Sequence, residues 1–276
     1  MKYLEIPVKV EGSMDYAKVN MYLLDTPMDK VKFTKRPMII ICPGGGYEKV
    51  SYREGEPLAM HFLNQGYHAC VLHYSVSPAR FPTPLLELGS VMKLLSEKAE
   101  EWQIDTEHIF LHGASAGGHL VGMLGVFWNQ KWLGETLQVE SEALRPAGVM
   151  LSYPVITSDE KLAHMGSFYN LLGERYEADK EKFSLENQVT KDTPPCFLWH
   201  TASDKTVPVE NSFLMAMALK NAGVPVELHI LPEGEHGLSL ASSLVERPDG
   251  SGVNEACQCW INLASAWMAR LCSKEQ

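Results

Sequence analysis

The most informative feature of the chain is the stretch Gly113-Ala114-Ser115-Ala116-Gly117. It follows the apolar run Ile109-Phe110-Leu111 and precedes an amphipathic segment, so it predicts a serine at a tight turn between a strand and a helix. Small flanking residues let neighbouring backbone approach without a Cβ clash, and the sharp turn points the hydroxyl outward, as a nucleophile requires. This pattern alone arises by chance about once in ten chains of this length. Whether Ser115 is a nucleophile therefore has to be judged from the motifs in the rest of the chain.

Composition limits both the architecture and the partners. The chain has 276 residues and is 45% hydrophobic, which fits one α/β domain, residues 1–276, with inserted loops. It carries 34 acidic and 24 basic side chains, a formal charge of -10, without a long Lys/Arg run. Nucleic acid and anionic membrane surfaces are therefore excluded as partners, since both need clustered positive charge.

The amino terminus and the cysteines indicate where the protein works. An acid and a proline interrupt the first seven residues, and no apolar run approaches 18 residues, so we expect a soluble, cytoplasmic protein. Six scattered cysteines indicate reduced thiols rather than a disulfide scaffold. The pair Cys257 and Cys259 misses the usual zinc spacing, so no metal site is expected. A homodimer is left open as the assembly state.

Strand-like segments and helix-like segments alternate along most of the chain. Continuous apolar runs such as residues 38–42 and 148–151 indicate central strands of a parallel sheet covered by helices on both faces. The first two strands are more polar and closely spaced, so we expect an antiparallel pair at the sheet edge. The predicted strands are residues 4–10, 18–24, 37–42, 68–74, 108–112, 147–153, 196–201 and 226–231.

Helices are predicted over residues 54–65, 85–102, 116–128, 209–221 and 254–271. Two further segments, residues 129–146 and 157–195, break the alternation and contain too many apolar groups for solvated loops. They predict either a helical cap over the carboxyl edge of the sheet or peripheral helices that contribute to no pocket.

A serine nucleophile needs a base, and the base needs a carboxylate that holds its tautomer. In folds with this turn, the acid and the histidine follow the serine in that order. His236 lies in a polar loop after the last predicted strand, and Asp204 is the carboxylate in the loop after the strand before it. Asp192 precedes that strand and is the weaker choice. Catalytic roles are therefore predicted for Ser115, Asp204 and His236.

Three glycines stand directly after the third predicted strand, in Pro43-Gly44-Gly45-Gly46-Tyr47. Bare backbone there can approach a substrate carbonyl, so we expect the amides of Gly45, Gly46 and Ala116 to form an oxyanion hole. A phosphate-binding loop is disfavoured, because neither the dinucleotide spacing nor a terminal Gly-Lys-Ser/Thr is present.

Several aromatic and histidine residues near these motifs have a structural alternative. Tyr47 and Tyr153, with Trp199, are candidates for stacking on a substrate, although each ring is also suited to the core. His112 and His119 are expected to be structural, since one ends a strand and the other lies on the following helix.

Taken together, these motifs resemble the serine esterases of the α/β-hydrolase superfamily, from the hormone-sensitive-lipase-like branch to the bacterial acetylxylan-esterase-like enzymes. The matching stretches are residues 43–47, 113–120, 203–208 and 235–237, and the likeness runs from about residue 37 to the carboxyl terminus. Lipases of this branch usually begin the glycine loop with histidine, so Pro43 favours the acetylesterase-like group. The resemblance implies a three-layer sandwich around a mainly parallel eight-stranded sheet.

The resemblance also implies ester hydrolysis without a cofactor. We expect a small-molecule ester substrate with a short acyl group such as acetyl. If the chain is similar in function to the acetylxylan esterases, the alcohol part of this ester is a sugar. An amidase of the kynurenine-formamidase type is the near alternative, because the same triad cleaves amides. A binding protein that has lost turnover is the third hypothesis, and the presence of all three triad residues argues against it.

Overall fold

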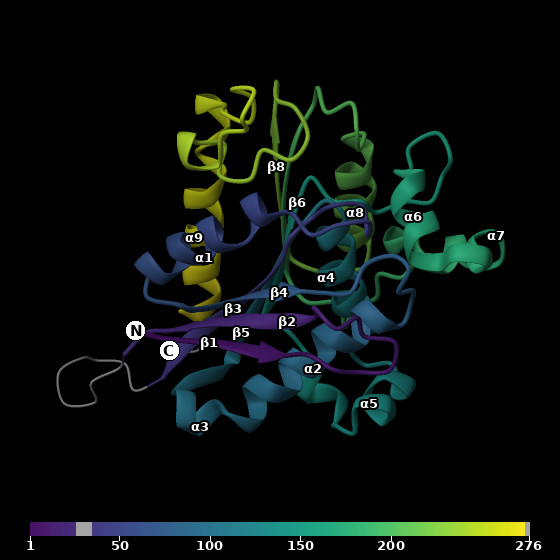
Figure 1. Cartoon of the computed structure of the whole chain (residues 1–276). Helices are drawn as coiled ribbons and strands as arrows, with labels where there is room; N and C mark the ends of the chain where they lie inside the picture. Colours follow the sequence, from purple (N-terminus) through teal and green to yellow (C-terminus); the bar gives the residue numbers. More distant parts are fainter. Residues whose placement is uncertain (26–34, 274–276) are drawn as a thin grey trace.

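One eight-stranded sheet runs through the residues that the computed structural model describes, 1–25 and 35–273 (Figure 1). Its order is β1-β2-β4-β3-β5-β6-β7-β8. The strands are β1 (Lys2–Pro7), β2 (Lys18–Leu23), β3 (Arg36–Cys42), β4 (His68–His73), β5 (Ile104–Ala114), β6 (Gly148–Ser152), β7 (Cys196–Thr201) and β8 (Val226–Leu231).

The strand directions confirm the predicted topology. β1 pairs antiparallel with β2, and β2 pairs antiparallel with β4, while every later pairing is parallel. β5 begins at Ile104, four residues before the predicted start, because Ile104 pairs with Arg36 across an irregularity that shifts the register before Met38. The polar residues between Ile104 and the apolar run hid this extension from a pattern-based prediction.

Helices cover both faces of the sheet and complete three layers (Figure 1). On one face lie α1 (Glu56–Asn64) and α9 (Trp260–Cys272), joined by a hydrogen bond between His61 and Ser265. On the other face lie α2 (Thr83–Glu97), α4 (Ala116–Phe127) and α8 (Glu210–Asn221). The predicted helix 85–102 is divided, since α3 (Ala99–Trp102) follows α2, and α9 starts six residues later than predicted.

The central strands are buried on both faces, as their continuous apolar runs predicted. Met38, Ile39, Ile40 and Ile41 all have 0% exposure, because their side chains alternate between the two helical layers. The carboxyl ends of β3, β5, β6, β7 and β8 lie at one edge of this rigid sheet. The loops that leave these ends carry the candidate site.

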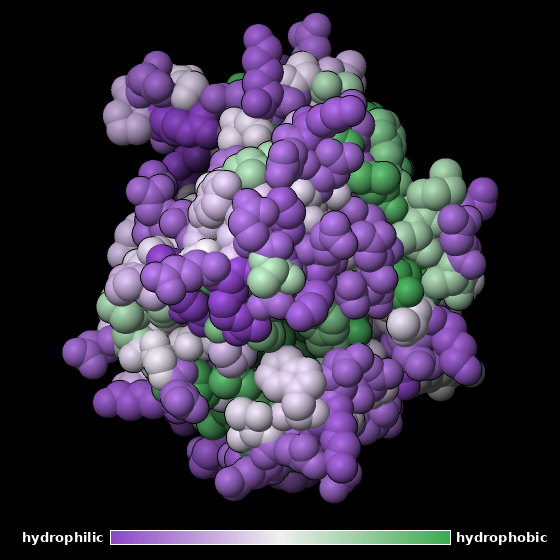
Figure 2. Space-filling view, turned by 90° about the vertical axis from the view of Figure 1, so that its right-hand side faces the viewer, coloured by the Kyte–Doolittle hydropathy of each residue, from purple (hydrophilic) through white to green (hydrophobic). Residues whose placement is uncertain are grey.

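The two segments that break the alternation contain short helices. Residues 129–146 hold α5 (Lys131–Leu137), and residues 157–195 hold α6 (Met165–Leu172) and α7 (Tyr176–Asp179), with 3-10 turns between them. α6 lies at the carboxyl edge of the sheet, where Asn170 donates to the carbonyl of Gly46, 3.0 Å away. Figure 2 faces the side on which α6 and α7 lie, and hydrophilic residues cover most of it between separate apolar patches. That residues 129–146 and 157–195 form a cap over the carboxyl edge stays a prediction.

Short 3-10 turns complete the chain at Tyr52–Glu54, Ser141–Leu144, Gly173–Arg175, Lys180–Phe183, Leu185–Asn187, Ser243–Val245 and Glu255–Cys257. Among the described helices, none combines the length and the apolar character that a bilayer crossing needs.

Candidate active site

Ser115 lies in the turn between β5 and α4, in a backbone conformation that side chains rarely adopt. Its φ is 54° and its ψ is -119°. Both flanking glycines are required by close approaches: a Cβ at Gly113 would lie 2.2 Å from the carbonyl oxygen of Gly117, and one at Gly117 would lie 2.0 Å from that of Cys42. The sequence folds into this strained turn because only hydrogen atoms fit at these two positions.

His236 joins Ser115 to Asp204. Its Nε2 lies 2.8 Å from Ser115 Oγ, and its Nδ1 lies 2.6 Å from Asp204 Oδ2. The ring of Tyr153 packs edge-on against the imidazole, with centroids 5.1 Å apart. The structure therefore brings together the serine, histidine and carboxylate that were predicted from the sequence, although they lie in three separate loops.

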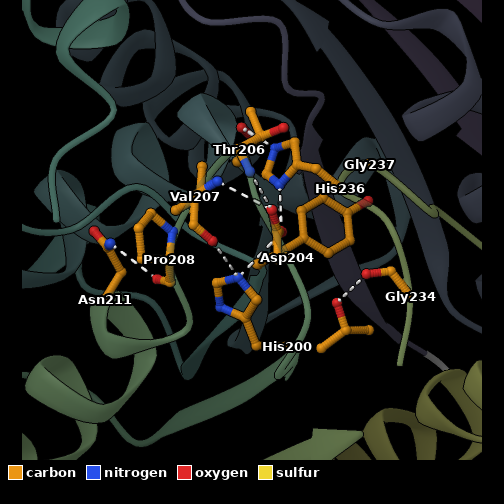
Figure 3. A network of polar contacts seen from close by, with 12 residues as sticks. His200, Asp204, Thr206, Val207, Pro208, Asn211, Gly234, His236 and Gly237 are labelled. Atoms are coloured by element: carbon orange, nitrogen blue, oxygen red, sulfur yellow. Dashed lines mark hydrogen bonds and ion pairs between the residues drawn. The ribbon is translucent and has the colours of Figure 1, made fainter. Parts of the chain in front are cut away.

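The Asp204 carboxylate lies between two histidines, with both oxygens engaged (Figure 3). Oδ1 accepts from the amides of Thr206 and Val207 at 2.8 and 3.0 Å, and Oδ2 faces His236 on one side and His200 on the other. Burial acts to raise the pKa of Asp204, but the hydrogen bonds from His200 and His236 outweigh it and hold the pKa well below its ordinary value.

This ionised carboxylate fixes the tautomer of His236. A carboxylate only accepts hydrogen bonds, so the Nδ1 of His236 donates to Asp204, and in a neutral ring the Nε2 lone pair then faces the Ser115 hydroxyl. That is the protonation state in which an imidazole can remove a proton from serine.

His200 is a contributor that the sequence did not reveal. It is fully buried at the end of β7, with Nδ1 2.8 Å from Ser212 Oγ and Nε2 3.0 Å from the carbonyl oxygen of Val207 and 3.3 Å from Asp204 Oδ2. The sequence places it inside the predicted strand 196–201, so no pattern indicated a role at the site. The available signal was its spacing, four residues before the acid that leaves the same strand.

Two arginines fasten the loop that carries His236. Arg247 donates to the carbonyl oxygens of His236 and Gly237 at 2.9 and 3.2 Å, and Arg53 donates to the carbonyl oxygen of Gly237 at 3.1 Å. Arg247 also forms an ion pair with Glu235 at 2.7 Å. These contacts fix the main chain on both sides of the imidazole, so the ring position does not depend on its own hydrogen bonds alone.

The glycine loop after β3 lies directly against Ser115. A Cβ at Gly44 would be 3.0 Å from Ser115 Cβ, and Gly45 and Gly46 have φ of 133° and 67°. The Gly44 amide donates to Glu54 at 2.8 Å, whereas the amides of Gly45 and Gly46 donate to no protein acceptor within residues 1–25 and 35–273. The Ala116 amide is the first of α4, where an intrahelical acceptor is lacking. An oxyanion hole formed by these three amides stays a prediction.

Glu54 is a second buried carboxylate at the site, and sequence reasoning missed it. It is 3% exposed, and its two oxygens accept from the Gly44 amide and the Tyr153 hydroxyl, each at 2.8 Å. The Tyr153 hydroxyl also accepts a hydrogen bond from the amide of Ser239 at 2.9 Å, and Ser239 lies three residues after His236 in the chain. Glu54 therefore connects the glycine loop with the histidine loop.

The predicted stacking residues are all enclosed by protein. Tyr47 is 1% exposed, with its hydroxyl 3.0 Å from His119 Nδ1, and Tyr153 is 2% exposed and bonded to Glu54. Trp199 is fully buried and stacks on Trp260 with centroids 4.8 Å apart. The contribution that the structure shows for these rings is to packing, and a substrate contact by Tyr47 or Tyr153 stays a prediction.

The side chains of the remaining candidates bond groups other than Ser115, Asp204 and His236. His112 bonds Ser152 Oγ at 2.9 Å, and His119 lies between Tyr47 and the carbonyl of Phe183. Burial lowers the pKa of His112 to about 3 and that of His119 to about 4, so both rings are neutral. Asp192 is exposed, and its main chain bonds residues 128 and 190. Among the described residues, no cluster of side chains is arranged to hold a metal ion.

The chain is similar in sequence to a xylanase and to esterases. Residues 24–219 match the family described as BD-FAE. The chain is 38% identical over 214 residues to endo-1,4-beta-xylanase B of Butyrivibrio fibrisolvens, a match that covers 75% of this chain and 33% of that protein. It is 29% identical to an acetylxylan esterase of Xylanibacter ruminicola, over 74% of this chain and 41% of that protein. The chain thus spans only a third to two-fifths of these relatives.

Solved structures are similar over nearly the whole chain. An acetyl ester-xyloside bifunctional hydrolase from Caldicellulosiruptor lactoaceticus is 35% identical with a TM-score of 0.82, covering 97% of this chain and 96% of that one. A carboxylesterase from Lactobacillus plantarum is 27% identical with a TM-score of 0.84, covering 98% of both chains.

Proposed function

Since this chain belongs to the BD-FAE family of α/β hydrolases, we propose that it hydrolyses short-chain carboxylic esters through an acyl-serine intermediate. The observation that carries the proposal is the continuous chain of short contacts from Ser115 Oγ through His236 to Asp204, 2.8 and 2.6 Å long. Similar proteins from several bacteria are named as esterases, which supports an ester as the substrate.

Each residue has one role in this reaction. His236 Nε2 takes the proton of Ser115 as Oγ attacks the ester carbonyl carbon, and the amides of Gly45, Gly46 and Ala116 bind the resulting oxyanion. His236 then gives the proton to the departing alcohol, and a water molecule repeats the sequence on the acyl-serine. Asp204 stays ionised throughout and stabilises the imidazolium.

We propose acetyl as the acyl group and a sugar as the alcohol. An acetylxylan esterase and an acetyl ester-xyloside hydrolase among the similar proteins support this choice.

The test compares the wild type with Ser115→Ala on 4-nitrophenyl acetate, longer acyl esters, an acetylated xyloside and N-formylkynurenine. We expect the acetyl esters to be cleaved fastest and the variant to lose at least about a thousandfold in kcat/KM. Ser273→Ala, which alters a hydroxyl at the exposed end of α9, is the matched control and is expected to be unaffected.

Circular dichroism checks that both variants fold. Equal rates for Ser115→Ala and the wild type would refute the acyl-serine mechanism, and absence of turnover by the wild type on every substrate would favour a binding protein. A strong preference for N-formylkynurenine would replace the ester proposal with the formamidase alternative.

A further inference from the structure

One face of α6 lies against the glycine loop. Asn170 donates to the carbonyl oxygen of Gly46 at 3.0 Å. A Cβ placed at Gly46 would be 3.7 Å from His164 Cε1 and 4.0 Å from Ser167 Oγ. His164, the N-cap of α6, is therefore a direct neighbour of the loop whose amides are proposed to bind the oxyanion.

The orientation of the His164 ring is fixed by Ser167. Nδ1 lies 2.8 Å from Ser167 Oγ and accepts from the Ser167 amide at 3.3 Å. Because a backbone amide only donates, Nδ1 is the acceptor and the proton of the neutral ring is on Nε2. Within residues 1–25 and 35–273, this Nε2–H has no protein acceptor. The nitrogen is accessible to solvent, so a ligand can reach it.

His164 is also within electrostatic reach of the catalytic pair. Burial lowers the pKa of His164, the charge of His236 lowers it further, and Asp204 acts in the opposite direction. The ring is consequently neutral at neutral pH and presents a hydrogen-bond donor without adding a positive charge beside His236. A second cation there would oppose the imidazolium that the reaction forms.

We propose that His164 determines substrate specificity, by donating a hydrogen bond from Nε2 to an oxygen on the alcohol part of the ester. This inference rests on the proposed function. An acetyl group has no acceptor besides its carbonyl oxygen, which the loop amides bind, so a further donor at Gly46 can act only on the alcohol. A hydroxyl or ring oxygen next to the acylated position of a sugar is the acceptor of this kind.

The test uses two acetates with a six-membered ring in the alcohol. One is a monoacetylated methyl xyloside, and the other is cyclohexyl acetate, which carries no further oxygen on its ring. We expect His164→Phe, which keeps a planar ring but removes the donor, to lose about five- to tenfold in kcat/KM on the xyloside. On cyclohexyl acetate it is expected to stay within about twofold of the wild type, which also shows that the variant is folded.

Two further variants complete the design. His164→Gln carries an amide donor and is expected to recover part of the loss on the xyloside. His229→Phe makes the same change on the edge strand β8, where Nε2 contacts Glu227 at 2.8 Å, and is expected to change neither rate. An equal loss by His164→Phe on both acetates, no loss on either, or no recovery by glutamine would overturn the inference. Absence of wild-type activity on both would instead count against the proposed function.

Discussion

Replacing Asp204 by asparagine tests the arrangement of the site in the most direct way. The orientation of the new amide is determined by its surroundings, because the amides of Thr206 and Val207 both donate to the position of Oδ1. Only the carbonyl oxygen of asparagine can accept these bonds, so its NH₂ group occupies the position of Oδ2, 2.6 Å from His236 Nδ1.

Two donors cannot face each other at that distance, so His236 must change its tautomer. Nδ1 then accepts from the asparagine, and the ring proton moves to Nε2, which lies 2.8 Å from Ser115 Oγ. In this state the imidazole cannot take the serine proton. His200 needs no such change, since its Nε2 keeps the carbonyl oxygen of Val207 at 3.0 Å.

We expect Asp204→Asn to lower kcat by about 10⁴-fold, the size of loss known for a triad with the wrong tautomer. This corresponds to about 5 kcal/mol of transition-state stabilisation. The assay is steady-state hydrolysis of 4-nitrophenyl acetate at neutral pH, with freshly purified variant and a check of folding by circular dichroism. Asp192→Asn is the matched control, because Asp192 is an exposed carboxylate and is expected to be dispensable.

A folded Asp204→Asn protein that keeps more than a tenth of the wild-type kcat would refute the reasoning about tautomers. Loss of activity in Asp192→Asn together with an active Asp204→Asn would assign the acid to the other loop.

Three further changes follow from the same contacts. Glu54→Gln leaves one of two buried donors, the Gly44 amide or the tyrosine hydroxyl, without an acceptor, so we expect unfolding in urea to show a loss of about 1–3 kcal/mol together with a lower kcat. Gly117→Ala places a Cβ 2.0 Å from the Cys42 carbonyl and is expected to lower the free energy of unfolding by about 2–3 kcal/mol or to prevent folding, as measured by expression and thermal melting. Because the folded-state pKa of Asp204 is depressed, its contribution to stability is complete above the unfolded value near 4 and is lost as pH falls below it; between pH 5 and pH 3 the wild type is therefore expected to lose more stability than Asp204→Asn.

The sequence predicted the sheet because the central strands follow a simple rule. Residues buried on both faces, such as Ile39 and Ile40, read as one apolar run, and the glycine spacing around Ser115 identified the turn that follows. The acid and the histidine could then be placed by chain order. Boundaries were less certain where polar residues extend an element, as at Ile104 in β5, since that extension is specified by pairing with β3 rather than by its own pattern.

The groups that support the site could not be predicted, because their partners are distant in the chain. Nothing local marks Glu54 as the acceptor for Tyr153, which is 99 residues away, or Arg53 as the donor to Gly237, which is 184 residues away. His200 was visible in the sequence but reads as a strand residue. Such contacts follow from which loops the sheet brings to one edge, and a motif carries no information about them.

The two buried carboxylates of the site differ in their partners, and the difference explains what each can do. Asp204 receives bonds from two imidazoles, so in the proposed reaction its charge stays beside His236 while that ring gains and loses a proton. Glu54 receives an amide and a phenol hydroxyl from separate loops, so its two oxygens hold Gly44 and Tyr153 in position relative to each other. A buried charge is costly unless its acceptors are filled, so each carboxylate favours the conformation in which all of its donors are in place. The arrangement around Ser115 thus depends on side chains from several loops at the carboxyl edge of the sheet, since Asp204 contacts His236 and Glu54 contacts the glycine loop and Tyr153.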